Sequence, residues 1–443
     1  MKKLLKELYW AGVKAVNPEK LVNKNIKLFL KFYRKQKRKK IIIISIGKAS
    51  FKMAMAGAKE LKKNLYKGII ITKYGHIDKN FVKNKLLKKF KMFEAGHPLP
   101  DENGLKATKE VLKIIEEEKK DCIFLLLISG GSSSLFVALR DGISLKDKIK
   151  TTEILLKAGA GIDDLNCVRK HLSKVKGGNF AKLIYPAPFV SFIISDVVSD
   201  KLDVIASGPT FPDRTTFKDA LKVLDKFKVK DRIPKTVLKL LKDGALGKIE
   251  ENPKEKNEIF KKNKNYIIGR NEIALKEIKR KAKEMGLNAK IVSCEIKGEA
   301  KVIGKKLLEF AIFEKERLRS KKGKIFIFGG ETTVNVKGKG KGGRAQELAL
   351  SFAINTKGRE GIYLLSAGSD GTDGPTDAAG AIVCPNTIKK AEKIKIDPLK
   401  YLEENNSYNF FKKVNDLFIT GPTGTNVMDL YLILIINKDF QLK

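Results

Sequence analysis

The stretch Lys40-Ile-Ile-Ile-Ile-Ser-Ile-Gly-Lys-Ala-Ser50 leads from a run of β-branched residues through a glycine into an amphipathic segment. Similar hydrophobic runs recur at 69–72, 122–129 and 189–195, with longer amphipathic segments between them. This alternation is typical of βαβ units. Because the runs are almost continuously hydrophobic, we expect strands that are buried on both faces of a largely parallel sheet. The first half of the chain is therefore predicted to be a Rossmann-like layered α/β domain.

The composition changes between 238 and 264, where polar and charged residues with Gly244, Gly247 and Pro253 suggest a linker. Beyond it the alternation resumes, and strands are expected at 265–268, 289–294, 324–328, 361–365 and 431–436. We therefore predict an N-terminal domain over 1–237, a charged linker over 238–264 and a smaller α/β C-terminal domain over 265–443. The first ten residues have helical spacing of Leu and Lys and predict an amphipathic helix.

The 443 residues carry 91 Lys and Arg against 50 Asp and Glu, a net charge of +41. Lysine is spread through nearly every segment, whereas nucleic-acid-binding proteins usually concentrate basic residues on one face or in a known motif. A basic nucleic-acid-binding protein is therefore an alternative from another functional class. The sequence assigns no partner to the excess charge as a whole.

The composition also bears on the cellular compartment and on whether the chain crosses a membrane. The hydrophobic runs are shorter than the roughly 20 residues that a membrane-spanning helix needs. The four cysteines have no paired short spacing, so neither a disulfide framework nor a zinc knuckle is expected. We expect reduced cysteines in a cytoplasmic protein without a membrane span.

Lys48 stands between the first predicted strand and a predicted helix, after Gly47. The amides at a helix N-terminus and a lysine beside them form a natural anion site. Because lysine is so common here, an ordinary surface lysine is the alternative.

A second loop, Ser129-Gly-Gly-Ser-Ser-Ser134, also follows a predicted strand. The residues Ser129, Gly130, Gly131, Ser132 and Ser133 could surround phosphate oxygens with amides and hydroxyls. The loop lacks the spacing and the final lysine of a P-loop, so a tight turn with helix-capping serines is the alternative.

Asp196 follows the predicted strand at 189–195. An aspartate there could accept a proton or hold Mg²⁺, and it could equally cap a helix or close a turn. Ser207, in Ala206-Ser-Gly-Pro-Thr210, comes shortly afterwards and is a further candidate for phosphate binding.

In the second half, Gly329-Gly-Glu-Thr-Thr333 follows a strand and offers the acid Glu331. The next glycines, at 338, 340 and 343, formally match G-x-G-x-x-G. We do not interpret them as a dinucleotide fingerprint, because 332–336 reads as a strand after a turn and the compact βαβ frame is missing. Arg344 is expected in the first turn of the following helix, where it could bind a transferring phosphoryl group.

The segment Gly368-Ser-Asp-Gly-Thr-Asp-Gly-Pro-Thr-Asp377 places Asp370, Asp373 and Asp377 among small residues after a strand. It predicts a metal- or substrate-binding loop, with a solvated turn as the alternative. It does not fit an EF-hand, because the bidentate glutamate is missing at the required distance. The three histidines are too far apart in sequence to suggest a catalytic triad or a zinc site.

Taken in order, these segments resemble the glycerate 2-kinases of the MOFRL family, also called type II glycerate kinases. The resemblance covers most of the chain. Its further motifs are Gly96-His-Pro-Leu-Pro-Asp101, Asn166-Cys-Val-Arg-Lys-His-Leu-Ser173 with Lys176-Gly-Gly178, Gly342-Gly-Arg-Ala-Gln-Glu347 and Thr420-Gly-Pro-Thr-Gly-Thr-Asn426.

The resemblance implies an ATP-dependent enzyme that phosphorylates the C2 hydroxyl of D-glycerate to 2-phosphoglycerate, with Mg²⁺. It also implies a MOFRL-type C-terminal domain and an active site in the cleft between the two domains. The lysine and arginine thought to be essential in the family correspond to Lys48 and Arg344.

On this basis we expect Lys48 and Arg344 to bind the glycerate carboxylate and the transferring phosphate. The serine-rich loop, Lys176 and Ser207 would contact substrate or nucleotide phosphates. Asp196 would be the base or a Mg²⁺ ligand, with Glu331 and Asp370 as rivals and Asp373 and Asp377 as further nucleotide or metal candidates. A hydroxypyruvate- or tartronate-linked reductase is the enzymatic alternative, and a homo-oligomer is compatible with the sequence.

Overall fold

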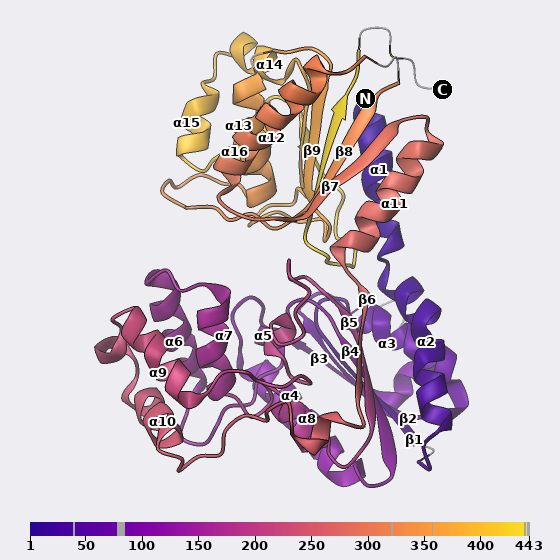
Figure 1. Cartoon of the computed structure of the whole chain (residues 1–443), viewed down its shortest axis with the longest axis vertical. Coiled ribbons are helices and arrows are strands. Elements are labelled where there is room, and N and C mark those ends of the chain that lie inside the picture. Colours follow the sequence, from indigo (N-terminus) through magenta and orange to yellow (C-terminus); the bar gives the residue numbers. More distant parts are fainter. Residues whose placement is uncertain (39, 78–84, 320–321, 357, 438–439, 441–443) are drawn as a thin grey trace. The chain divides into compact units, whose positions relative to one another are not determined.

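The computed structural model describes residues 1–38, 40–77, 85–319, 322–356, 358–437 and 440. The chain forms two compact units (Figure 1). We call Pro18–Ile268 the N-terminal unit, and Met1–Asn17 together with Gly269–Lys443 the C-terminal unit. Each unit is built around its own six-stranded sheet.

The sheet of the N-terminal unit has the strand order β3-β2-β1-β4-β5-β6. β1 pairs in parallel with β2 and β4, β2 pairs in parallel with β3, and β4 pairs in parallel with β5. The strands are β1 (Lys40–Ile46), β2 (Leu65–Lys73), β3 (Phe90–Ala95), β4 (Cys122–Ile128), β5 (Phe189–Ile194) and β6 (Lys264–Gly269). Every residue of β4 and β5 is buried, as expected for central strands covered on both faces.

Helices cover both faces of this sheet. Side chains of α4 and α8 pack with Ile42, Ile44 and Phe124 in one hydrophobic core. On the opposite face α3 packs so closely that a Cβ on its Gly57 would lie 3.3 Å from the Ile43 side chain. The helices of this layered part are α2 (Pro18–Arg34), α3 (Ser50–Leu61), α4 (Glu102–Glu118), α5 (Ser132–Leu135) and α8 (Asn179–Ile184).

A group of helices beside the sheet has a separate core, formed by residues such as Leu155, Val168 and Phe217. The helices are α6 (Leu145–Lys157), α7 (Ile162–His171), α9 (Phe217–Lys226) and α10 (Lys235–Ala245). Capping boxes at Ser144 and Thr216 fix where α6 and α9 begin. α7 of this group lies next to the loop that follows β5, because its Asn166 accepts a hydrogen bond from the Ser207 hydroxyl.

The C-terminal unit contains a mixed sheet of order β11-β10-β9-β12-β8-β7. β7 pairs with β8 in parallel, whereas β12 runs antiparallel to both β8 and β9, and β10 runs antiparallel to β9 and β11. The strands are β7 (Asn288–Ile296), β8 (Lys324–Gly330), β9 (Ile362–Gly368), β10 (Gly380–Val383), β11 (Leu417–Phe418) and β12 (Asp429–Ile435).

Within this unit α12 and α13 lie on one side of the sheet, and α1 and α11 lie on the other (Figure 1). The Tyr9 hydroxyl of α1 donates to the Gly368 carbonyl at 2.7 Å, which ties the first helix to the end of β9. The helices are α1 (Lys2–Ala15), α11 (Asn271–Glu284), α12 (Ala300–Glu316), α13 (Arg344–Thr356), α14 (Thr387–Lys393), α15 (Pro398–Glu403) and α16 (Ser407–Lys413).

The predicted fold class is confirmed, with a parallel, layered first sheet and a second α/β unit. The amphipathic N-terminal helix is also confirmed, as α1. The strand expected at 332–336 is wrong, because that segment forms only an isolated bridge between Thr333 and Glu299. Segment 238–264 holds most of α10, a short helical turn at Glu258–Phe260 and the first residue of β6, all within the N-terminal unit.

In the described part of the chain, no helix combines the length and the hydrophobicity that a membrane crossing requires. The four cysteines are free thiols, and Cys122, Cys167 and Cys384 are buried.

Candidate active site

The loops that follow β1 and β4 meet at the topological switch point of the parallel sheet. In the order β3-β2-β1-β4-β5-β6 the chain runs outward in both directions from β1 and β4, and ligands of such sheets bind beyond the carboxyl ends of those strands. Here the Lys48 amide donates to the Gly130 carbonyl at 2.8 Å, and the Ala49 amide donates to the Ser129 hydroxyl at 3.1 Å. The two loops singled out in the sequence therefore form one structure.

Three side chains converge on the Gly130-Gly131 turn. A Cβ on Gly130 would lie 2.3 Å from a carboxylate oxygen of Asp196. Gly131 has φ +86°, and a Cβ there would lie 3.2 Å from Cγ of Lys48 and 3.0 Å from the His97 ring. The turn thus needs glycines because Lys48, His97 and Asp196 approach it from three different loops.

The serines of this loop hold its shape. The Ser132 hydroxyl lies within hydrogen-bond distance of the carbonyls of Ser129, at 2.6 Å, and Ile46, at 2.9 Å. The Ser133 hydroxyl lies 3.1 Å from the Ser207 hydroxyl, which links this loop to the one after β5. Helix α5 starts at Ser132 without a side-chain cap, so these serines do not act as helix caps. Their role in phosphate binding stays a prediction.

Lys176 is 1% exposed and lies in a loop that contacts the segment of Ser207. The Gly177 amide donates to the Ser207 carbonyl at 3.0 Å, and the Gly178 amide donates to the Gly208 carbonyl at 2.7 Å. Burial, followed by the nearby charges of Lys148 and Arg169, holds the pKa of Lys176 well below its usual value. Lys176 and Ser207 are therefore neighbours in one part of the N-terminal unit.

Arg344 begins α13 in the C-terminal unit and is bound by two carboxylates. Its Nε and Nη2 donate to Asp429 at 2.7 Å and 3.0 Å, and its Nη1 lies 2.5 Å from Glu331. Burial favours the neutral form, but the attraction of Asp429 and Glu331 prevails and holds the pKa of Arg344 above its usual value. The structure thus brings Arg344 and Glu331 together, as two of the predicted site residues.

Asp373 reaches back to the start of the same helix. It accepts hydrogen bonds from the Ala345 amide at 3.1 Å and the Gln346 amide at 2.8 Å. Burial and the charge of Asp429 nevertheless raise the pKa of Asp373 to about 7. Asp373 therefore anchors the loop of residues 368–377 to the N-terminus of α13, where a carboxylate is favourable.

The other two acids of that loop have different surroundings. Asp370 accepts from the Thr372 amide at 3.1 Å, and its own carbonyl accepts from the Thr423 amide at 3.1 Å. Asp377 is exposed, and a hydrogen bond with the Tyr408 hydroxyl lowers its pKa. Only Asp373 of the three is buried, so the segment is more than a solvated turn.

Residues 338–343, the formal G-x-G-x-x-G match, form an irregular segment that runs along α15 and α16. The Gly340 amide donates to the Glu404 carbonyl at 2.9 Å, and the Lys341 amide donates to the Asn406 side chain at 3.1 Å. No strand leads directly into these glycines within the described residues around them. The segment is therefore a connection that is fixed to the C-terminal helices rather than a strand-to-helix turn.

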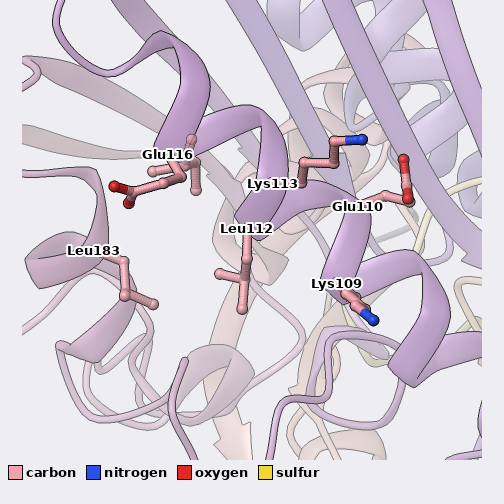
Figure 2. A pocket seen from close by; sticks show the side chains of 7 residues that line it. Lys109, Glu110, Leu112, Lys113, Glu116 and Leu183 are labelled. Atoms are coloured by element: carbon pink, nitrogen blue, oxygen red, sulfur yellow. The ribbon is translucent and has the colours of Figure 1, made fainter.

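Among the residues that the structure describes, no group of three or more acidic, histidine or cysteine side chains is arranged to hold a metal ion. An open hollow on the outer surface lies between α4 and Leu183 of α8, and Figure 2 shows Lys109, Glu110 and Glu116 along it. None of its lining residues is among the candidates from the sequence. This hollow is distinct from the loops at the switch point.

Four neighbours of the predicted site residues received no role from the sequence. Asp429 binds Arg344, Asn166 accepts a hydrogen bond from Ser207, and the charges of Lys148 and Arg169 act on Lys176. A signal existed for Asp429, because it is the single acid at the start of the hydrophobic run of β12. Asn166 and Arg169 lie in a motif that was quoted for the family resemblance but received no role. Lys148 has no signal in the sequence, because it resembles every other lysine of an amphipathic helix.

Comparison with known proteins gives a consistent result along the chain. Residues 4–242 match a domain of unknown function, DUF4147, and residues 324–429 match the MOFRL family. A D-glycerate 2-kinase of Thermotoga maritima is 43% identical over 439 residues, covering 98% of this chain and 99% of the relative. A glycerate 2-kinase of Pyrococcus horikoshii is 42% identical, covering 90% of this chain and 88% of the relative.

A solved structure supports the same relationship. The crystal structure of a glycerate kinase from Thermotoga maritima aligns with a TM-score of 0.85 at 42% identity, covering 98% of this chain and 99% of that chain. Both the sequence and the fold are therefore shared over nearly the whole length, and the chain belongs to the MOFRL family of glycerate 2-kinases.

Proposed function

We propose that this protein transfers the γ-phosphoryl group of ATP to the C2 hydroxyl of D-glycerate, giving 2-phosphoglycerate and ADP. The near-full-length identity to a D-glycerate 2-kinase supports the choice of substrate. The observation that carries the chemistry is the position of Lys48, whose loop is hydrogen-bonded to the Gly130 turn at the switch point. Phosphoryl transfer depends mainly on positioning and on neutralising charge, which cations and amides at this edge of the sheet can supply.

In this proposal Lys48 and Arg344 bind the glycerate carboxylate and the transferring phosphoryl group. A guanidinium has five N–H donors. Asp429 and Glu331 engage three of those of Arg344 in the described contacts, so further donors remain to bind an oxyanion. The amides of the Ser129–Ser133 turn, with Lys176 and Ser207, would bind phosphate oxygens.

The C2 oxygen of glycerate forms the new bond to phosphorus, and the bond between that phosphorus and the leaving ADP oxygen breaks. The hydroxyl proton must pass to a base, and we assign this role to Asp196. Its carboxylate lies against Gly130, and Lys48 and His97 lie against the next residue of the turn, Gly131. A carboxylate at this position can accept the hydroxyl proton as a general base.

We further propose that the reaction uses Mg²⁺, which offsets the charge of the nucleotide phosphates when it is bound. Mg²⁺ is usually held by one or two carboxylates together with substrate phosphates and water, so a complete protein cage is not required. The carboxylates of Asp196 and Asp370 have the appropriate oxygen donors, with Glu331, Asp373 and Asp377 as further candidates from the sequence. A cytoplasmic location and a homo-oligomeric state are also proposed, and gel filtration with light scattering tests the latter.

The decisive experiment is an assay of ADP release with D-glycerate and ATP·Mg²⁺, followed by identification of the phosphorylated product. We expect 2-phosphoglycerate, and little turnover with L-glycerate as the matched control. Formation of 3-phosphoglycerate would contradict the assignment of the hydroxyl. Oxidation of NAD(P)H with hydroxypyruvate, without ADP release from glycerate, would favour a reductase.

A further inference from the structure

Three basic side chains lie close together in the interior of the N-terminal unit. They are Lys148 on α6, Arg169 on α7 and Lys176 in the loop after α7, and we call them the cation cluster. Lys148 is 6% exposed and Lys176 is 1% exposed, whereas Arg169 is half-buried. Each lysine is repelled by Arg169, and Lys176 is also repelled by Lys148. The cluster therefore concentrates positive charge within the unit.

No carboxylate forms an ion pair with any member of this cluster within the described part of the chain. The neighbouring Lys170 provides an internal contrast. It is 4% exposed, and its ammonium nitrogen lies 3.3 Å from a carboxylate oxygen of the fully buried Asp213. The same helix thus pairs one buried lysine with an acid and leaves Arg169, one residue earlier, without one.

Keeping buried cations without acidic partners is unfavourable for folding. Removing a charge from water costs free energy unless an opposite charge or several hydrogen bonds compensate. Like charges in the same region add to that cost. Groups with such perturbed ionisation are concentrated at functional sites, where a ligand supplies the missing partner.

A buried amide supplies an independent indication of a ligand. Asn166 lies one helical turn before Arg169 and is 4% exposed. Its Oδ1 accepts from the Ser207 hydroxyl at 3.0 Å, whereas its buried Nδ2 has no hydrogen-bond partner among the described residues. The unused group is a donor, as are the three cations, so the missing partner is an acceptor with negative charge.

The same hydrogen bonds connect the cluster to the switch point. Ser207 bonds to Asn166 on one side and lies 3.1 Å from the Ser133 hydroxyl on the other. Ala206 and Ser207 have φ values of +53° and +62°, which non-glycine residues adopt only where the surroundings enforce them. This strained backbone positions the Ser207 hydroxyl between the serine-rich loop and α7.

We propose that Lys148, Arg169 and Lys176, with the amide of Asn166, form a binding site for a phosphate-bearing anion. The charge favours phosphate over a simple carboxylate, because a carboxylate carries one negative charge and a phosphate monoester carries nearly two at neutral pH. The site takes either the polyphosphate of a nucleotide or the phosphoryl group of a phosphoglycerate. The naming of these two sources rests on the proposed kinase function, but the anion site does not.

The test measures binding without turnover. Calorimetric titrations with ADP, 2-phosphoglycerate, inorganic phosphate and D-glycerate are compared for the wild type and for Lys148→Met, Arg169→Gln and Lys176→Met. Lys150→Met is the matched control, because Lys150 is an exposed lysine on the same helix. We expect each cluster variant to weaken at least one phosphate-bearing ligand by about tenfold or more, as for a lost charged hydrogen bond, and the control to leave all affinities unchanged.

The pattern of losses identifies the source of the anion. Weaker ADP binding assigns the site to the nucleotide, whereas weaker 2-phosphoglycerate or phosphate binding with unchanged ADP binding assigns it to the phosphorylated product. Unchanged affinities for all four ligands, or a loss confined to D-glycerate, would overturn the proposal. If the wild type does not turn over glycerate but the cluster variants still bind phosphate-bearing ligands more weakly than the wild type does, the anion site is supported and the kinase assignment is wrong.

Thermal unfolding separates a binding role from a structural one. If Lys176 is kept for a ligand, Lys176→Met removes a buried amine that has no acidic partner and raises the unfolding temperature of the ligand-free protein. It also abolishes the stabilisation that added phosphate ligand gives the wild type. A lower unfolding temperature combined with unchanged stabilisation by phosphate ligands would show that Lys176 has a purely structural role and would contradict the proposal.

Discussion

Arg344 and Asp429 form a bidentate ion pair, with Nε to Oδ2 at 2.7 Å and Nη2 to Oδ1 at 3.0 Å. The pair joins the first residue of α13 to the first residue of β12 across 85 positions of sequence. The Tyr431 hydroxyl also lies 3.1 Å from Asp429. Asp429 therefore fixes the orientation of the guanidinium that we expect to bind phosphate.

Replacing Asp429 should weaken both stability and function. The Asp429 side chain is 1% exposed and that of Arg344 is 34% exposed. Because the arginine is partly solvated, we expect Asp429→Ala to lower the free energy of unfolding by about 2 kcal/mol, less than for a fully buried pair. Urea denaturation checks this value, with the exposed Glu309→Ala as control. An unchanged denaturation midpoint would show that the pair does not stabilise the unit.

Removing Lys48 or Arg344 should impair the reaction. We expect Lys48→Ala and Arg344→Ala to lower kcat/KM with D-glycerate by about 10²-fold or more, as for the loss of a transition-state contact. Lys59→Ala on α3 is the control for Lys48. Steady-state kinetics on variants with native circular dichroism measures this loss. A near-wild-type kcat/KM in either variant would exclude that residue from the chemistry.

Two glycines allow the crowding at the serine-rich turn to be separated from backbone strain. Gly131 and Gly142 have φ of +86° and +82°, so alanine at either position should cost about 1–2 kcal/mol. Only at Gly131 would the new Cβ meet Lys48 and His97, whereas at Gly142 nothing lies within 4 Å. We therefore expect both variants to lose stability by thermal unfolding, Gly131→Ala the more, and a large loss of kcat/KM only for Gly131→Ala. Equal activities would argue against a site at this turn.

The affinity of the cation cluster for phosphate ligands should fall at alkaline pH. Burial and the charge of Arg169 lower the pKa of Lys148 to about 8, so the lysine loses its charge as the pH rises through that value. Phosphate monoesters are already fully ionised there, because their second pKa is about 6. Titrations of ADP and 2-phosphoglycerate between pH 7 and pH 9 should show the decrease, and Lys148→Met should remove the part that Lys148 contributes. A pH-independent affinity in the wild type would contradict this assignment.

The same shift makes an opposite prediction for the stability of the ligand-free protein. Between a folded pKa of about 8 and the usual value of 10.5, the unfolded chain binds a proton at Lys148 that the folded chain does not. The contribution of Lys148 to stability therefore rises with pH across this window. Denaturation midpoints of the wild type and Lys148→Met, measured from pH 8 to pH 10, should converge as the pH rises.

The hydrophobic runs at 40–46 and 122–129 predicted β1 and β4 almost to the residue, because a strand buried on both faces is hydrophobic throughout. β3 (Phe90–Ala95) escaped prediction, since it lies at the edge of the sheet and includes the polar Lys91 and Glu94. β10 (Gly380–Val383) is only four residues long and owes its strand conformation to antiparallel pairing with β9 and β11. Its sequence carries too few residues for a periodic signal.

The candidate site also combines residues that local sequence predicted with contacts that only the fold creates. Lys48, the serine-rich turn and Arg344 were predicted because each follows a glycine at the start of a helix, which is a local feature of the chain. The contacts of Asp373 with Ala345 and Gln346, and of Arg344 with Asp429, join segments that are distant in sequence. The contact of Arg344 with Asp429 exists only because antiparallel pairing places β12 between β8 and β9.

The sequence by itself determined the strands and helices, the excess of lysine and the loops that carry glycine with a charged residue, because these depend on residue type and short-range spacing. Tertiary structure alone decided which lysines lose their contact with water. Lys148 and Lys150 stand two residues apart on α6, yet Lys148 is buried against α7 and Lys150 is exposed. Burial depends on the packing of segments that are distant in sequence. Only the folded chain therefore distinguishes a buried lysine such as Lys148, which we propose binds an anion, from a solvent-exposed one such as Lys150.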